Sequence, residues 1–389
     1  MKKCLLLLIT LLSIKTLALN AQGINFRKGS WAKIKAQAKA EKKYIFVDAY
    51  TTWCGPCKWL DKNIFPQKKV GDFFNKYYVS YKFDMEKGEG VKFAKKYKVV
   101  EYPTMLYFNP QGELVHKTKG ASTAQTLIKR AGNGLDSEKQ LYKLKQKFNK
   151  GERGGQFLKN YIEALGDAKE KLTQPMRLYF EQIDKRDWSN EDNWILIQKY
   201  ERSALSNIFS YVFANKERFI KTNGSNKVNG YILQRLVRGV EEVARSNDQS
   251  KLDAFIKKLQ VFFGTDAPRR IARTKHLFYA RNQAQSFQYT YDYFDNYCND
   301  VHELNRIASD YAQKFEEQSY LKKALYWVEK SIKIDKRSFN TYTQAHLFYK
   351  LKRYKQAKKV AKESIRLAKK EGKSFEDTKK LLREIKRVM

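Results

Sequence analysis

The protein has 389 residues, and its 78 lysines and arginines outnumber its 41 aspartates and glutamates, which gives a formal net charge of +37. This length predicts two or three domains whose cores need no disulfide support. Hydrophobic residues make up 42% and aromatic residues 14% of the chain, which excludes a disordered protein in spite of the charge. Four cysteines in a chain of this length exclude a disulfide-scaffold protein.

The first 21 residues have the pattern of a secretory signal peptide. A basic start, Met1–Lys3, precedes the apolar run Leu5–Leu12, and Lys15 ends this run before the ~20 residues that a membrane span needs. Small residues at Ala18 and Ala21 suit cleavage near Ala21. An uncleaved N-terminal anchor is the alternative. We therefore predict an exported, soluble, periplasmic protein.

The positive charge raises the question of nucleic acid, but its distribution argues against this partner. Lysines are spread along the whole chain, and no arginine-rich arm or tail stands out. The aromatic residues recur at helical spacing, which is typical of core packing rather than of base stacking. The charge instead favours acidic proteins or an anionic membrane face as partners.

Residues 22–135 alternate between helical and strand-like patterns. The order is helix, strand, helix, helix, strand, helix, strand, strand, helix, which predicts an α/β domain with a mixed central sheet flanked by helices. The predicted segments are a helix from Trp31 capped by Ser30, a strand over Tyr44–Val47, a helix after Cys57 with Trp59 and Ile64, a helix over Val70–Tyr77, a strand over Tyr78–Phe83, a helix over Val91–Tyr97, strands over Thr104–Phe108 and Glu113–Lys117, and a helix over Thr123–Arg130.

The remaining residues predict an all-α, repeat-like domain, because amphipathic helices follow one another with few prolines between them. Residues 136–300 show no convincing period, so their helical fold stays undetermined. Residues 301–389 show a period of 33 and resemble tetratricopeptide repeats, with Lys352 where such repeats usually have glycine. Such repeats build a surface for a peptide or protein client. The matching pairs are Ala312/Ala345, Phe315/Phe348, Leu321/Tyr354, Ala324/Ala357, Ser331/Ser364 and Ile332/Ile365.

The spacing of the two cysteines in the motif Cys54-Gly55-Pro56-Cys57 indicates a specific reaction. Two intervening residues place both sulfurs on the first turn of a helix, close enough for a disulfide. The helix N-terminus stabilises a thiolate on Cys54, and the thiolate is the form that attacks a partner disulfide. Cys57 then resolves the mixed disulfide. Pro56 restricts the turn and helps to set the relative stability of dithiol and disulfide.

Two structural alternatives compete with this redox interpretation. A zinc site needs two more ligands, and Cys298 with the histidines His116, His276, His302 and His346 offers no second pair at ligand spacing. An inert disulfide is the other alternative, although it would seldom lie between a buried strand and the start of a helix. We expect no metal and no other cofactor, and we interpret Cys298 as a buried thiol among aromatic residues.

Residues 24–132 resemble the thioredoxin superfamily, and in particular the C-terminal domain of membrane thiol-disulfide interchange reductases. The matching elements are Val47-Asp48, Trp53 to Lys58, Tyr102-Pro103-Thr104 and Gly120. The resemblance implies that Asp48 is a buried acid that handles the proton of Cys57. It also implies that Pro103 is a cis-proline that docks the substrate backbone.

Some of these roles have open alternatives. Asp48 could be a strand-end acid satisfied by local N–H groups, and Pro103 could be an ordinary trans proline. Trp53 is either a lid beside the site or a packed aromatic residue. Two departures from the family stand out: Ser80 occupies the place where a lysine is expected near the acid, and Tyr102 is bulkier than the usual residue.

These observations predict an exported thiol–disulfide oxidoreductase that exchanges disulfides with protein substrates and works more as a reductase than as an oxidase. Outside the cytosol a reductase needs electrons, which implies a donor embedded in the membrane. The alternative is a client-binding or scaffold protein with an accessory redox site. The predicted catalytic residues are Cys54, Cys57 and Asp48, with Cys54–Cys57 as the redox-active disulfide, and the predicted substrate-binding residues are Trp53, Gly55, Pro56, Tyr102, Pro103 and Thr104.

Overall fold

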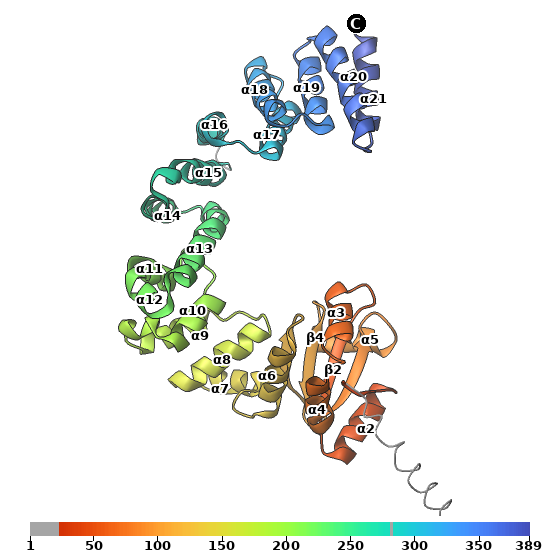
Figure 1. Ribbon diagram of the computed structural model, residues 1–389, viewed down its shortest axis with the longest axis vertical. Coiled ribbons are helices and arrows are strands. Elements are labelled where there is room, and N and C mark those ends of the chain that lie inside the picture. Colours follow the sequence, from red (N-terminus) through yellow and green to blue (C-terminus); the bar gives the residue numbers. More distant parts are fainter. Residues whose placement is uncertain (1–22, 281–282) are drawn as a thin grey trace, which may run out of the picture. The chain divides into compact units, whose positions relative to one another are not determined.

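The computed structural model describes residues 23–280 and 283–389 (Figure 1). The predicted signal peptide, residues 1–21, lies outside the described residues. The chain divides into two compact units, one that ends at Tyr200 and one that begins at Glu201. Within the described ranges, no helix combines the length and the apolar character that crossing a membrane requires.

The first unit contains a five-stranded mixed sheet with the strand order β1-β3-β2-β4-β5. Strands β1 and β2 run parallel to β3, whereas β4 runs antiparallel to both β2 and β5. The predicted mixed sheet is therefore confirmed, and the two-residue strand β1 is an addition to it. The strands are β1 Phe26–Arg27, β2 Tyr44–Tyr50, β3 Tyr78–Asp84, β4 Thr104–Phe108 and β5 Leu114–Lys119.

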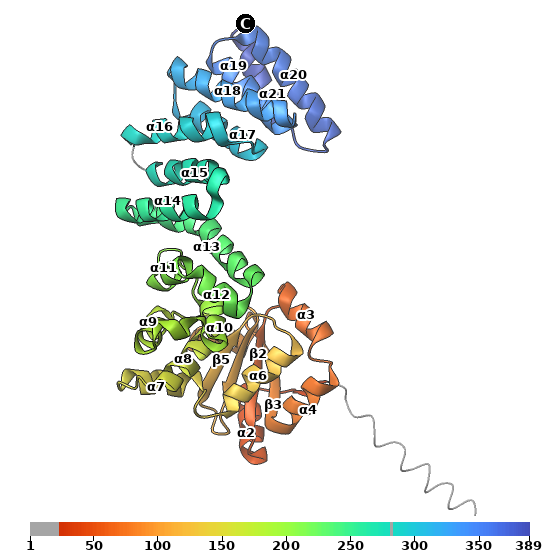
Figure 2. The same cartoon turned by 60° about the vertical axis from the view of Figure 1, so that its left-hand side comes forward.

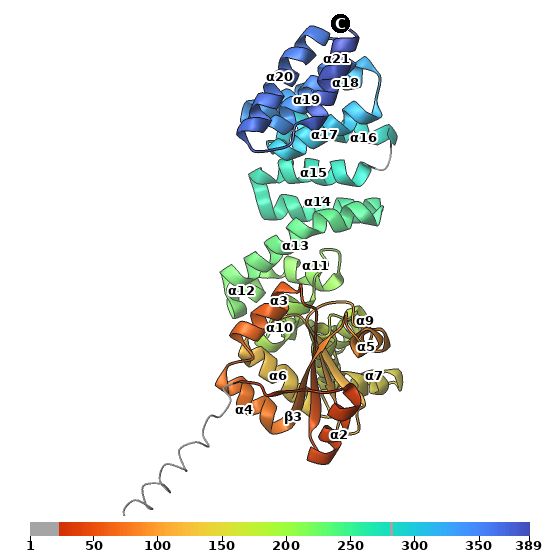
Figure 3. The same ribbon diagram turned by 90° about the vertical axis from the view of Figure 1, so that its right-hand side faces the viewer.

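Helices cover both faces of this sheet, because alternate strand residues are apolar on each side (Figure 3). Phe46 and Tyr107 lie in the core formed with α3, α4 and α6, whereas Val47 and Leu106 lie in the core formed with α2 and α5. The central strands β2 and β4 are thus buried on two sides, which fixes the positions of their ends. The helices are α2 Trp31–Glu41, α3 Gly55–Asn63, α4 Lys68–Tyr77, α5 Glu89–Tyr97 and α6 Ala124–Leu135.

Among the described residues of the first unit, four further α-helices follow α6, and two of them, α7 and α8, pack on β5. The buried His116 of β5 accepts a hydrogen bond at Nδ1 from the N–H of Leu141 at 3.1 Å. Burial lowers the pKa of His116 to about 4, so the ring is neutral in this role. The domain boundary predicted at residue 135 falls between α6 and α7, within this unit. The helices are α7 Leu141–Asn149, α8 Gly155–Asp167, α9 Thr173–Gln182 and α10 Glu191–Tyr200.

The second unit is helical throughout its described residues, as the sequence predicts for this part of the chain. From α13 to α16, and again from α17 to α21, each helix packs against the next one along the chain (Figure 2). The helices are α11 Asn207–Ala214, α12 Lys216–Asn223, α13 Ser225–Ser246, α14 Gln249–Phe263, α15 Ala267–Tyr279, α16 Gln283–Asp292, α17 Val301–Lys314, α18 Gln318–Ile334, α19 Ser338–Lys350, α20 Tyr354–Lys370 and α21 Glu376–Arg387.

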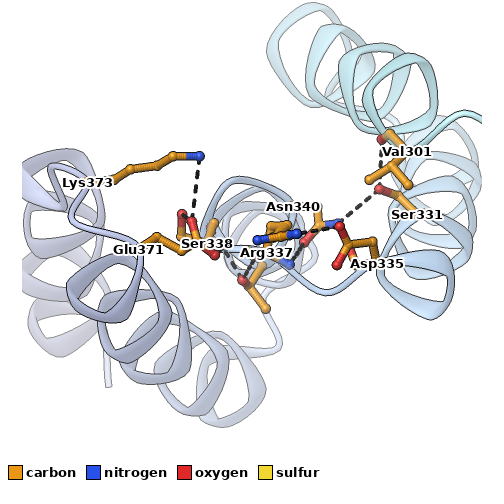
Figure 4. Close-up of polar contacts among 9 residues, drawn as sticks. Val301, Ser331, Asp335, Arg337, Ser338, Asn340, Glu371 and Lys373 are labelled. Carbon is orange, nitrogen blue, oxygen red and sulfur yellow. Dashed lines mark hydrogen bonds and ion pairs between the residues drawn. The ribbon is translucent and has the colours of Figure 1, made fainter.

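The period of 33 residues corresponds to a repeated contact in this unit. Ser331 of α18 donates a hydrogen bond to the carbonyl oxygen of Val301, the first residue of α17, at 2.9 Å (Figure 4). Ser364 of α20 donates in the same way to the carbonyl oxygen of Ser338, the first residue of α19, at 2.9 Å. Lys352 adopts the left-handed conformation, with φ 61, at the position where the repeats usually have glycine. Two matched helix pairs therefore exist, and their assignment as tetratricopeptide repeats stays a prediction.

Candidate active site

The two cysteines of the motif form a disulfide at the start of α3. Cys54 is the N-cap residue of this helix, and its Sγ accepts a hydrogen bond from the N–H of Cys57 at 3.1 Å. Pro56 occupies the first turn, where a missing N–H costs no helical hydrogen bond. A Cβ built on Gly55 would meet no atom within 4 Å, so this side of the turn is open. The helix terminus therefore places sulfur where the N–H groups stabilise a thiolate.

Asp48 lies near the carboxyl end of β2 and is fully buried. Within residues 23–280 and 283–389, neither of its carboxylate oxygens has a hydrogen-bond donor. The Nζ of Lys82 lies 3.8 Å from Oδ2, which is an ion-pair distance beyond hydrogen-bonding range. Burial raises the pKa of Asp48 to about 7, and the positive charge of Lys82 opposes part of that rise. A carboxyl group with this pKa can accept and release a proton near neutral pH.

The geometry around Asp48 bears on the alternative of a locally satisfied acid, whereas its role in proton transfer stays a prediction. Local N–H groups of the described residues do not satisfy its carboxylate, so the alternative of a locally satisfied strand-end acid does not fit. Tyr50, two residues further along β2, has a raised pKa, caused first by its own burial and then by the charges of Asp84 and Asp48.

The expectation that Ser80 replaces the lysine near the acid is wrong. The parallel register of β2 and β3 places Ser80 beside Phe46 and Lys82 beside Asp48. The lysine is therefore present, two residues further along the strand on the same face. Lys82 also forms an ion pair with Asp61 of α3, which ties this lysine to the helix that carries the cysteines.

The loop before β4 has the conformation that the resemblance implies. The Tyr102–Pro103 peptide bond is cis, which excludes the trans alternative for Pro103. The N–H of Gly120 donates to the carbonyl oxygen of Pro103 at 2.8 Å. The hydroxyl of Thr104 donates to the carbonyl oxygen of Glu101 at 2.6 Å. These bonds fix the backbone on both sides of the proline.

Trp53 joins this loop to the cysteines. Its ring lies edge-on to the ring of Tyr102, with the centroids 5.9 Å apart. Its Nε1 donates to both carboxylate oxygens of Glu86, at 2.9 and 3.0 Å. The side chain is 65% exposed, so it is a tethered surface aromatic beside the disulfide rather than a core residue. The structure thus brings residues 48, 53–57 and 102–104 to one end of the sheet.

Sequence reasoning missed two residues near this site, Lys82 and Glu86, and gave no role to Trp59, which is exposed on the helix that carries the cysteines. Lys82 depends on strand register, and Glu86 lies in a loop without a characteristic spacing. Trp59 is 45% exposed on α3, one turn after Gly55, and was predicted only as a helix residue. Its large exposed ring two residues after Cys57 was the one available signal.

Cys298 has a different environment from the cysteine pair. It is a buried free thiol that directly follows a π-helical turn, Tyr293–Tyr297. Its Sγ lies 3.8 Å from Oε2 of Glu303. Burial raises the pKa of this thiol, which disfavours the reactive thiolate. The prediction of a buried thiol is confirmed.

A mixed five-stranded sheet, a Cys-X-X-Cys disulfide at a helix N-terminus and a cis-proline loop beside it define the thioredoxin fold with its redox site. A family model described as thioredoxin-like domain matches residues 31–133.

Known proteins resemble the same part of the chain. A thioredoxin-like protein of Synechocystis is 30% identical over 101 residues, which cover 26% of this chain and 90% of that protein. The thiol:disulfide interchange protein DsbD of Pseudoalteromonas atlantica is 30% identical over 79 residues, which cover 20% of this chain and 13% of DsbD. The solution structure of a candidate disulphide-isomerase from Bacteroides thetaiotaomicron is 47% identical, with a TM-score of 0.29, and covers 30% of this chain and 98% of that one.

The chain therefore belongs to the thioredoxin-like family through its first unit, and its domain is a thiol–disulfide oxidoreductase of that family. The matched region leaves most of the helical residues without a counterpart in these relatives.

Proposed function

We propose that the protein is an exported thiol–disulfide oxidoreductase that mainly reduces disulfides in protein substrates. The observation that carries this proposal is the pairing of a disulfide at the start of α3 with a buried acid, Asp48, whose pKa is raised to about 7. The Gly-Pro dipeptide between the cysteines, which resembles that of reducing thioredoxins, supports the reductase direction.

The reaction starts from the reduced pair. The Cys54 thiolate attacks one sulfur of the substrate disulfide and releases the other sulfur as a thiolate. Cys57 then transfers its proton to Asp48 and attacks Sγ of Cys54. This step releases the second substrate sulfur as a thiolate and forms the Cys54–Cys57 disulfide, so two electrons pass from the protein to the substrate. Asp48 gives up its proton to solvent, and the two substrate thiolates take up protons from solvent. A dithiol donor returns two electrons and two protons, and in an exported protein we propose a membrane-embedded donor.

Around the cysteines, we propose that Trp53, Gly55, Pro56 and the segment Tyr102–Thr104 contact the substrate. The exposed ring of Trp53 and the open side of Gly55 leave space for a polypeptide next to the sulfurs. Export rests on the basic and apolar pattern of residues 1–21. No metal or organic cofactor is needed for this chemistry.

The test is reduction of insulin disulfides by dithiothreitol with catalytic amounts of the protein. Cys54→Ser is expected to lower the rate at least 100-fold, whereas Cys298→Ser is expected to retain the wild-type rate. Equal activity of wild type and Cys54→Ser would refute the proposal. A Cys57→Ser variant is expected to accumulate mixed disulfides through Cys54, and mass spectrometry of these adducts identifies the substrates.

We propose binding of a client by the helical residues 136–389 as a second function, because stacked helix pairs, marked here by the repeated contacts of Ser331 and Ser364, are an arrangement that presents a surface to peptides or proteins. In this alternative the redox site is accessory. Pull-down with the Cys54→Ser variant separates the two, because a client held by the helices stays bound without a mixed disulfide and resists reducing agent.

A further inference from the structure

The turn after α8 contacts the loop that carries the cis-proline. Lys169, in this turn, forms an ion pair with Glu101, which directly precedes Tyr102. The Nζ of Lys169 also lies 3.6 Å from where a Cβ on Gly120 would stand. Gly120 in turn donates its N–H to the carbonyl oxygen of Pro103. Lys169 therefore pairs with the side chain of Glu101 and lies close to the position of Gly120, next to the two segments on either side of the proline loop.

This turn is firmly attached to the sheet. Glu170 accepts from Lys117 of β5 at 3.1 Å and from Lys145 of α7 at 2.5 Å. Burial raises the pKa of Glu170, but the two lysines outweigh burial and lower it overall, so the carboxylate is charged at neutral pH. Leu158 and Leu165 anchor α8, the helix that leads into the turn, because both side chains are buried. The position of Lys169 is thus set by the packed helices.

The turn makes one rim of the site basic. Lys119, directly before Gly120, together with the exposed Lys169 and Lys171, places three ammonium groups on the turn and the end of β5. Lys169 forms an ion pair with Glu101, whereas no carboxylate of the described residues pairs with Lys119 or Lys171. Lys119, Lys169 and Lys171 outnumber Glu101, the carboxylate that pairs with this group, so a polypeptide that docks along the turn meets more positive than negative side chains there, whereas Glu86 lies on the Trp53 side of the site.

We propose that the α8–α9 turn forms a rim of the substrate-docking surface and that it selects disulfide partners with acidic side chains next to the reactive cysteine. This inference rests on the proposed redox function and assigns part of its specificity to residues outside the matched domain, 31–133. Lys169 acts as a specificity-determining residue, because its ammonium can pair with a carboxylate of the substrate while it stays close to Glu101.

The chain offers a well-matched pair of variants. Lys169 adopts φ 50, a left-handed conformation that glycine accepts more easily, so Lys169→Gly deletes the ammonium without straining the turn. Lys42, the C-cap of α2, adopts φ 52, and Lys42→Gly makes the same change at a helix end that leads into the opposite end of β2. Each variant is assayed with two disulfide-bonded peptides of equal length whose cysteines are flanked by aspartates or by lysines.

For wild type, we expect kcat/KM on the aspartate peptide to exceed that on the lysine peptide about tenfold at low salt, and to approach it in 0.5 M NaCl. Lys169→Gly is expected to lower kcat/KM on the aspartate peptide about threefold through KM, with kcat unchanged. Lys169→Arg is expected to restore the preference, and Lys42→Gly to leave it intact.

Equal behaviour of Lys169→Gly and Lys42→Gly on the aspartate peptide would overturn the inference while leaving the redox function standing. A parallel loss on both peptides would also overturn it, because that result indicates a merely structural role. Failure of the redox function itself is distinct, since wild type and Cys54→Ser would then reduce neither peptide.

Discussion

Each of the two units places a carboxyl group in a partly or fully buried polar setting, and the two settings differ in how the charge is compensated. Asp48 in the first unit is fully buried, and its ion-pair partner among the described residues is Lys82, at 3.8 Å. Glu303 in the second unit accepts from the hydroxyl of Tyr293 at 2.7 Å and from Arg273 at 3.0 Å. Burial acts on both groups, yet the pKa of Asp48 is raised and that of Glu303 is lowered.

The difference teaches how to separate a chemical site from a structural one in this chain. A carboxylate supplied with donors contributes to stability and has no reason to exchange its proton. A buried carboxylate without hydrogen-bond donors lowers stability. Such a group is expected mainly where it serves a function such as proton transfer. The cysteines show the same contrast between a reactive and a structural environment. The disulfide pair is in the unit with Asp48, whereas the buried Cys298 lies beside Glu303.

The largest expected effect is that of Asp48→Asn on stability. The folded pKa of about 7 lies above the ordinary value of 3.8, so the folded state loses stability as the pH rises from about 4 through 7. Asn carries no charge, and we expect the variant to be more stable than wild type by up to about 4 kcal/mol at pH 8 and by little at pH 4. Hydrogen exchange of β2 amides measures this difference within the first unit.

The same variant is expected to slow insulin reduction, because Cys57 then has no proton acceptor. A gain in stability combined with a loss of rate would mark Asp48 as a functional acid. If Asp48→Asn destabilises β2 at pH 8, the carboxylate is compensated after all, and the contrast with Glu303 fails.

The sequence predicted most of the first unit because its strands alternate between two cores and its helices have apolar faces. Strand β1 escaped prediction since Phe26–Arg27 is too short for a periodic signal, and only pairing with Ser80 and Tyr81 defines it. The packing of α7 and α8 on β5 was also invisible, because it depends on tertiary contacts such as that of His116 with Leu141.

In the second unit, neutralising the buried carboxylate of Glu303 is expected to lower stability at neutral pH, opposite to the effect expected at Asp48. Burial raises the pKa of Glu303, but the Tyr293 hydroxyl and the Arg273 charge outweigh burial and lower it. This carboxylate therefore stabilises the fold above its ordinary pKa, and the contribution is lost as the pH falls through the folded value. We expect Glu303→Gln to cost about 1–2 kcal/mol at pH 7 and little in acid, measured by hydrogen exchange of α17 amides.

Arg273→Met serves as the matched control, because it removes the cation and leaves the carboxylate in place. A neutral or stabilising effect of Glu303→Gln at pH 7 would show that compensation does not distinguish the two carboxyl groups.

The cysteine motif was readable from the sequence because its spacing indicates its chemistry, and the role of Pro103 was expected from the resemblance to thioredoxins. The lysine beside Asp48 could not be predicted in this way. A shift of two residues between β2 and β3 keeps every side chain on the same face of the sheet, yet it moves Lys82 away from Asp48. Contacts across long separations, such as Glu101 with Lys169, likewise have no local signature.

The smallest expected effect concerns Glu86, a third carboxylate, whose partner is the indole of Trp53 at 2.9 Å. Unlike Asp48 and Glu303, Glu86 is exposed, so water replaces the indole when that donor is removed. Trp53→Phe keeps a ring against Tyr102 and deletes only the donor. We expect it to cost about 0.5 kcal/mol by denaturation at pH 7 and to raise KM for insulin about twofold. A cost as large as that of Glu303→Gln would show that burial does not determine how much a missing donor matters, and the contrast between Asp48 and Glu303 would then need another cause.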